Sequence, residues 1–144
     1  MNDLQEFDKN ISNITQEQWS QLFKLIPIIG RTKNFGKFSP IKKPMDGNII
    51  LPYMQPSQIV QRFFYIVCDI GIIHPFDWMD WDEGKKILDN SKTDFDKLDI
   101  KTLCMLITVI VRNDRFSDGY LVQCFNEGII LKIIKAMKIN IRVK

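Results

Sequence analysis

Apolar residues recur at every third or fourth position along most of this chain, which is the spacing of helices that bury one face. The first such run predicts a helix over residues 15–26, where Thr15 and Gln18 have the form of a capping box. Pro27 is expected to end this helix. Residues 1–13, by contrast, are polar and rich in Asn and Asp, and they predict a flexible lead-in outside the domain.

Five later segments share the helical pattern. Gly71 and Gly128 each follow one of them, in the position of the left-handed residue that ends a helix. The run Leu103–Val111 is apolar on almost every side, so its helix is expected to be the central one. Side chains that can cap a helix precede three of the segments. The segments expected to be helical are 57–70, a short helix opening at the acidic residues 77–83, 100–112, 117–127 and 129–137, with Ser57, Asp99 and Ser117 as caps.

Residues 27–56 differ in kind, because they contain five of the six prolines and three of the seven glycines. The pair Asp46-Gly47 can supply the positive φ angles of a tight turn between two short apolar pieces. We therefore expect an irregular segment with at most a small β-hairpin. The predicted fold is a single domain over 14–144, mainly α with five to six helices, and with this minor hairpin in 27–56; its class is α or α+β.

The chain of 144 residues has the size of one domain, and its content of 45% hydrophobic and 26% charged residues is ordinary for a globular protein. No apolar run approaches the roughly 18 residues that cross a bilayer. Residues 1–6 lack the basic start and apolar stretch of a secretory signal. These features predict a cytoplasmic protein that does not bind membranes.

The three cysteines, Cys68, Cys104 and Cys124, each lie within an apolar helical pattern, which predicts buried and reduced thiols. The single histidine, His74, has no cysteine within four residues, so the spacing of a zinc site is lacking. We expect no metal and no cofactor.

Charge is unevenly distributed, although the formal net charge is only +3. Six basic residues and no acid lie between Glu17 and Asp46, and five basic residues and no acid follow Glu127. Segment 77–99, by contrast, has eight acids and four lysines. If the two basic segments meet in space, they form the positive face that a nucleic-acid contact needs. The alternative is a solvated surface without such a partner.

Two motifs stand out together: Phe76-Asp77-Trp78-Met79-Asp80-Trp81 and Val111-Arg112-Asn113-Asp114-Arg115-Phe116-Ser117-Asp118-Gly119. With the later helix ending at Gly128, they resemble a bacterial family of small domains of unknown function, whose members show Phe-Asp-Trp-x-x-Trp and Val-Arg-x-Asp-Arg-Phe-x-x-Gly elements. The resemblance covers residues 53–137. It implies a shared domain and assigns no activity. The residues it marks as candidates are Asp77, Trp78, Trp81, Arg112, Asp114, Arg115, Phe116 and Gly119.

Arg112 and Arg115 can be interpreted in two ways. Separated by three positions, they lie on one face of a helix, where two guanidinium groups could bind an anion. Alternatively, they pair with Asp77, Asp80 or Asp114 and tie the helix end to the Trp78 segment. In both cases, the Asp77 region is expected to lie close to the turn formed by residues 112–116.

The tryptophans of the first motif also allow two interpretations. Trp78 and Trp81 are three positions apart and are expected to share one helical face. Their rings could stack on a ligand beside the arginines. Alternatively, they are core residues or anchors of a protein interface.

The chemistry expected of an enzyme is weakly represented. His74 precedes Pro75, and no Gly-x-Ser-x-Gly elbow is present. Segment 117–127 has no basic residue, so it does not fit a DNA-recognition helix. We therefore assign no catalytic residue and favour a non-catalytic domain that binds an unknown protein through the Trp78/Trp81 surface or through residues 27–56. The alternatives are a small-ligand or enzyme site around Asp77, Arg112 and Arg115, and weak nucleic-acid binding through the basic segments.

Overall fold

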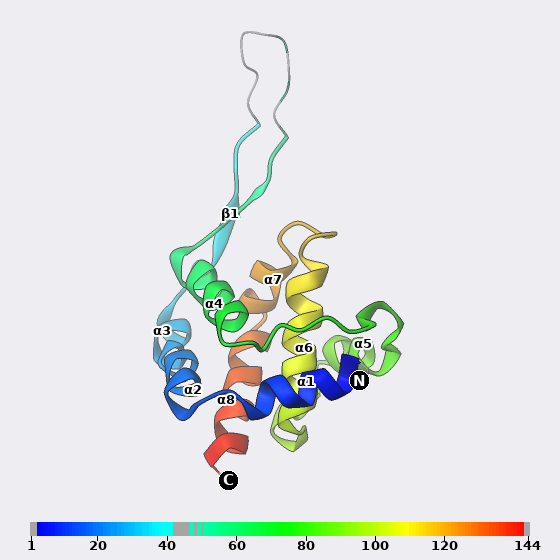
Figure 1. Ribbon diagram of the computed structural model, residues 1–144. Coiled ribbons are helices and arrows are strands. Elements are labelled where there is room, and N and C mark those ends of the chain that lie inside the picture. Colours follow the sequence, from blue (N-terminus) through cyan, green and yellow to red (C-terminus); the bar gives the residue numbers. More distant parts are fainter. Residues whose placement is uncertain (1–2, 42–46, 48, 50, 143–144) are drawn as a thin grey trace.

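A computed structural model describes residues 3–41, 47, 49 and 51–142 (Figure 1). They form a helical domain from which a two-stranded hairpin extends away (Figure 1), which confirms the predicted fold class. The elements in chain order are α1 (Asp3–Ser12), α2 (Gln16–Phe23), α3 (Leu25–Arg31), β1 (Gly36–Phe38), β2 (Met54–Pro56), α4 (Gln58–Asp69), the 3-10 turn η1 (Trp78–Asp80), α5 (Asp82–Asp89), the 3-10 turn η2 (Phe95–Lys97), α6 (Ile100–Asn113), α7 (Tyr120–Asn126) and α8 (Ile129–Arg142).

Helix α6 is the centre of the core, as its hydrophobic pattern predicted. Every residue from Leu103 to Val111 is buried, and α1, α5, α7 and α8 contact this helix. Burial of one such Leu or Ile side chain stabilises a fold by about 1.5–3 kcal/mol. No helix in the described part of the chain is both long and apolar enough to cross a membrane.

The first predicted helix is present but divides into two. The capping box is confirmed, because the Gln18 amide donates to Thr15 Oγ1 (3.1 Å) and the Thr15 amide donates to Gln18 Oε1 (2.9 Å). The chain bends at Lys24 and continues as α3. Pro27 is the third residue of α3, a position at which a helix needs no N–H donor, so the expectation that Pro27 ends the helix is wrong.

Residues 3–12 form helix α1, so the prediction of a flexible lead-in is wrong for them. Phe7 is completely buried, and its ring meets the rings of His74 and Phe76 edge-on at 5.7 Å. With Ile11 and Ile14, Phe7 forms an apolar stripe at helical spacing. The polar composition around these three residues concealed that stripe. Together with the division of the first helix, α1 explains why the structure has more helices than the five to six expected.

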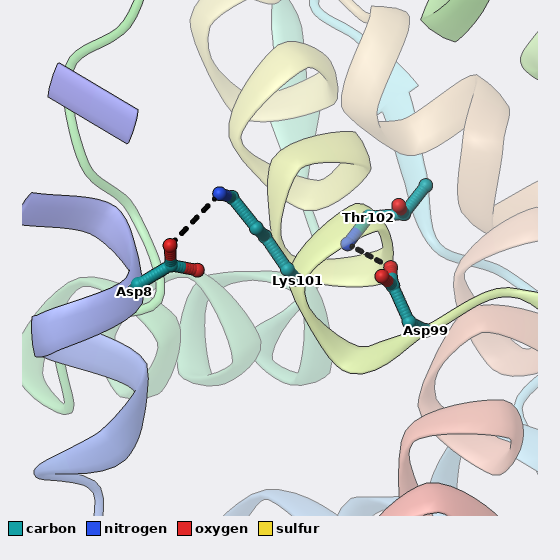
Figure 2. A network of polar contacts seen from close by, with 4 residues as sticks. All are labelled: Asp8, Asp99, Lys101 and Thr102. Carbon is teal, nitrogen blue, oxygen red and sulfur yellow. Dashed lines mark hydrogen bonds and ion pairs between the residues drawn. The ribbon is translucent and has the colours of Figure 1, made fainter. Parts of the chain in front are cut away.

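Polar contacts join α1 to α6 and start α6 itself (Figure 2). Lys101 Nζ lies 2.9 Å from Asp8 Oδ2, an ion pair that crosses between the two helices. The Asp99 carboxylate accepts a hydrogen bond from the Thr102 amide (2.8 Å), so the predicted cap is confirmed. Hydrogen bonding from Thr102 lowers the pKa of Asp99 below its ordinary value.

The predicted hairpin is present, with β1 and β2 antiparallel and Lys37 paired with Gln55. The Ser39 amide extends the ladder by donating to the Tyr53 carbonyl (2.8 Å). The expected turn at Asp46-Gly47 cannot be compared, because Asp46 lies outside the described residues.

Two of the three cysteines are buried, as expected. Cys104 is fully buried and Cys124 is 2% exposed, and burial raises the pKa of the Cys124 thiol to about 12. Cys68, however, is exposed on α4, and the expectation of a buried thiol is wrong there. Its neighbour Val67 faces the core, and the next residue of a helix points about 100° away.

Candidate functional site

The two sequence motifs meet at the surface. The rings of Trp78, in η1, and Phe116, in the turn between α6 and α7, have centroids 6.2 Å apart. They belong to an open depression of about 320 Å³, which we call the aromatic–arginine depression. The expected closeness of the Trp78 segment and the 112–116 turn is therefore confirmed. The residues lining the depression are Pro75, Phe76, Trp78, Met79, Arg112, Arg115 and Phe116.

Several of these side chains are exposed although they are apolar. Phe116 is 71% exposed and Met79 is 52% exposed, while Trp78 is half-buried. Phe76, at the base, is buried and contacts Phe7 and Trp81. The depression thus has a fixed apolar base and a rim of large side chains that the domain itself does not cover.

The two arginines lie at the depression without an ion-pair partner in the described part of the chain. The ion pairs between described residues are Lys101–Asp8 and His74–Glu6. The expected pairing of Arg112 or Arg115 with Asp80 or Asp114 is therefore not formed. The reason is visible for Asp114, whose carboxylate points to α7 instead of to the arginines.

The arginines also act electrostatically on Cys68 of α4. Partial burial raises the pKa of this thiol, and the nearby charges of Arg112 and Arg115 lower it less than burial raises it. The pKa therefore stays above its ordinary value, so the thiol is not activated as a nucleophile.

Asp114 has a structural role at the start of α7. Its Oδ1 accepts a hydrogen bond from the Leu121 amide (2.9 Å) in the first turn of α7. This contact satisfies one of the amides that a helix start leaves without a partner. The expectation that Ser117 caps this helix is wrong, because α7 begins only at Tyr120 and the cap comes from the previous turn.

Asp118 and Gly119 attach the hairpin to the helices. Asp118 Oδ2 accepts a hydrogen bond from the Met54 amide of β2 (2.7 Å). Gly119 has a φ of +92°, which side chains rarely adopt, and an added Cβ would lie 3.0 Å from Met54 Cε. The end of the second motif therefore fixes where the hairpin leaves the domain.

Trp81 does not share a helical face with Trp78, so that expectation is wrong. It lies between η1 and α5 with φ −86° and ψ 79°, because the acidic helix begins at Asp82 instead of Asp77. Its ring packs edge-on against Phe76 (5.7 Å), and a Cβ on Gly84 would overlap it. Trp81 thus holds η1 against the core. Asp77, directly before η1, is exposed and does not line the depression.

The two basic segments also meet, as the charge pattern allowed. Lys24 and Lys138 line one groove of about 500 Å³ between α2 and α8. The base of the groove is aromatic, with Trp19 and Phe23 stacked at 5.8 Å, but Trp19 is only 3% exposed. Lys42, Lys43 and Lys144, which belong to the predicted positive face, lie outside the described residues.

Sequence reasoning missed two features of the site. Met79 and Pro75 line the depression, but neither has a periodic pattern or a chemistry that would mark it. It also gave no signal that Phe116 is exposed, since an aromatic residue beside a helix end is equally suited to a core. Among the described residues, no three His, Cys, Asp or Glu side chains are grouped as a metal site requires.

Comparisons with known proteins identify a family but assign no activity. No curated protein and no solved structure matches the chain significantly. The model of a family of unknown function, DUF6508, matches residues 14–142, so it includes every residue that lines the aromatic–arginine depression and leaves out α1. The chain therefore belongs to the DUF6508 family, a family of unknown function.

Proposed function

We propose that this protein is a non-catalytic interaction module that binds a protein partner through the aromatic–arginine depression and the hairpin. The observation that carries this proposal is the distribution of exposed large hydrophobic side chains. Ten such side chains occur in the described part of the chain, and seven of them lie on these two elements. Single exposed apolar residues are ordinary, but grouped ones are typical of binding surfaces. The seven are Phe38 of β1, Ile41, Ile49, Leu51 and Tyr53 from the described residues between β1 and β2, and Met79 and Phe116 from the depression.

The hairpin offers a partner its exposed side chains, and the outer edge of β2 is closed to an added strand. On the outer edge of β2, the Met54 amide is bonded to Asp118, while the prolines at 52 and 56 have no N–H. On the outer edge of β1, the Gly36 amide donates to Asn34 Oδ1 (3.1 Å) and Pro40 has no N–H, but the Phe38 amide between them has no hydrogen-bond partner among the described residues. An edge without free amides resists the addition of another strand, which is the case for β2 and not for β1. The partner is therefore expected to pack on the exposed apolar side chains.

The composition of the depression also supports a protein interface. Tryptophan and arginine are enriched among the residues that contribute most to protein–protein binding energy, and such residues cluster beside apolar pockets. Trp78, Arg112 and Arg115 combine these types around one depression. The same turn carries Asp118 and Gly119, which hold the base of the hairpin, so both elements are fixed to one support.

The experiment compares two exposed aromatic residues. Phe116 is 71% exposed at the depression, and Tyr65 is 68% exposed on α4, outside it. The wild-type protein, Phe116→Ala and Tyr65→Ala are immobilised and exposed to extract of the source cell, with nuclease and at high salt, and retained proteins are quantified by mass spectrometry. We expect a partner that Phe116→Ala loses and Tyr65→Ala keeps. Equal retention by both variants would contradict the proposal.

A second candidate is a small anionic ligand in the same depression. Its volume of about 320 Å³ lies at the lower end of the roughly 300–1,000 Å³ that ligand pockets occupy. This candidate predicts an added mass on the purified protein in native mass spectrometry that disappears in Arg112→Gln. An unloaded wild-type spectrum would count against it.

A third candidate is weak nucleic-acid binding at the groove between α2 and α8. The convergence of Lys24 and Lys138 supports it. The buried ring of Trp19 does not, because base stacking needs an accessible ring face. Fluorescence anisotropy with a single-stranded oligonucleotide tests it: binding must weaken steeply with salt and in the variant Lys24→Gln/Lys138→Gln.

A further inference from the structure

We infer that the aromatic–arginine depression recognises an acidic side chain, Asp or Glu, that is flanked by apolar side chains in a segment of the protein partner. The inference rests on the proposed function, because it names the chemistry of the partner at that same site. It is carried by the charge of the depression, by its apolar walls and by the acidic residues beside it.

The first argument is an excess of positive charge. Of the seven residues that line the depression, two are arginines and none is acidic. Lys85 adds a third cation at the rim, where its Nζ donates a hydrogen bond to the Met79 carbonyl (2.6 Å). No ion pair between described residues uses Arg112 or Arg115. Guanidinium groups next to apolar rings bind carboxylates more strongly than they do in open water.

The second argument is the apolar wall. Trp78 and Phe116 face each other at a ring angle of 39°, and Met79 and Pro75 complete the rim. A carboxylate alone would use the arginines and leave these side chains in water. A carboxylate with an apolar neighbour can bind the arginines and also contact the apolar wall, since the neighbour covers the exposed ring of Phe116. The small volume of the depression suits one or two side chains.

The third argument concerns the size of the negative charge. Asp80, Asp82 and Glu83 are exposed and lie within five residues after Trp78 in the chain. Acids so close to the depression repel a polyanion such as a nucleic acid, whose binding depends on many phosphate contacts. A single carboxylate inserted between the arginines avoids most of that repulsion. The occupant is therefore a lightly charged peptide segment.

Two peptides that differ only in charge test the inference. N-acetyl-Phe-Glu-Leu-amide and N-acetyl-Phe-Gln-Leu-amide are titrated into the full chain, and the indole N–H signal of Trp78 is followed by two-dimensional NMR. The chain has three tryptophans, so Trp78→Phe assigns the signal, and the Trp19 indole is the internal reference. We expect the Glu peptide to bind roughly 10-fold more tightly than the Gln peptide, the gain of about one charge-assisted contact.

Arginine variants at the depression and away from it identify the residues responsible. Arg112→Gln/Arg115→Gln is expected to lower the affinity for the Glu peptide to that of the Gln peptide. Arg31→Gln, on the exposed face of α3, is expected to leave it unchanged. Because neither site forms an ion pair between described residues, both variants are expected to fold.

The outcomes separate this inference from the proposed function. Equal affinity for the two peptides, or binding of the Glu peptide that the double variant retains, would overturn the inference. Phenylacetate that shifts the Trp78 signal as strongly as the Glu peptide would assign the site to a free small acid and would also overturn it. If neither peptide binds while a captured partner still depends on Phe116, the inference fails and the proposed function stands.

Discussion

The second motif has an inward half and an outward half, although they alternate along nine residues. Asp114, Asp118 and Gly119 contact other segments of the domain, where they start α7 and hold the hairpin. Arg112, Arg115 and Phe116 surround an open depression and have few contacts within the domain. Residues of one motif can therefore have different roles. In this turn, some residues stabilise the fold and others form the exposed surface of the depression.

The first motif divides in the same way. Trp81 packs on Phe76 and leaves room only for a glycine at position 84, while Trp78 reaches the surface beside Phe116. The two halves predict opposite mutant behaviour: inward substitutions change stability, and outward substitutions change binding. The following predictions start with the largest expected change in the free energy of unfolding.

Gly119→Ala is expected to destabilise the protein most, by about 2 kcal/mol, because an alanine pays for a left-handed conformation and also crowds Met54. Urea unfolding followed by circular dichroism measures the change. Gly30→Ala is the matched control, since Gly30 lies in α3 with open space around it, and its replacement is expected to be neutral or slightly stabilising. Equal effects of the two substitutions would contradict the role of Gly119.

Asp114→Ala is expected to destabilise by about 1 kcal/mol, the usual loss when a helix-capping carboxylate is removed. The capped amide, Leu121 N, then has no partner in the protein. Hydrogen exchange of the α7 amides should accelerate in this variant. Asp80→Ala, at an exposed carboxylate in η1, serves as control; a comparable loss of stability there would remove the distinction between the two acids.

The capping carboxylate of Asp99 is expected to have a smaller effect on the free energy of unfolding, and this effect depends on pH. Its pKa is lowered in the folded protein, so it stabilises the fold above the unfolded value of 3.8, and this contribution is lost as the pH falls through the lowered pKa. Below about pH 4, the stability of the wild type should therefore fall more steeply than that of Asp99→Asn. Parallel slopes in unfolding experiments across this range would contradict the assignment.

Arg112→Gln/Arg115→Gln is expected to change stability least, within about 0.5 kcal/mol, which is usual for surface substitutions. If the arginines were paired with a buried carboxylate, replacing them would instead lower the free energy of unfolding by about 3–5 kcal/mol. Denaturant unfolding therefore distinguishes an arginine that holds the fold from one that is available to a ligand. A large destabilisation would show that the arginines belong to the inward half.

Local signals explain what could be predicted from the sequence. The capping box at Thr15, the Asp99 cap and the uninterrupted apolar run of α6 each depend on residues a few positions apart, and all three are present. Gly71 also ends its helix with a positive φ of 90°. The closeness of the two motifs was predicted because arginines and acidic residues of complementary charge occur in them, although the ion pairs expected with Asp80 and Asp114 are not formed.

What could not be predicted depends on contacts between distant segments. The sequence is compatible with Asp114 pairing with an arginine or capping α7. The path of the turn places its carboxylate at the Leu121 amide, so it caps α7. Phe7 is buried by His74 and Phe76, far along the chain, so its polar neighbours were misleading. The exposure of Phe116 likewise follows from where α6 ends relative to η1, which no local pattern encodes.

The most direct test of the central claim measures two quantities on one variant, Phe116→Ala: the free energy of unfolding and the retention of the protein partner. A 71% exposed ring contributes little to folding, so we predict unchanged stability together with lost binding, while Tyr65→Ala loses neither. A variant that is destabilised by more than about 2 kcal/mol, or that is stable and still holds the partner, would contradict the division of the motif into a folding half and a binding half.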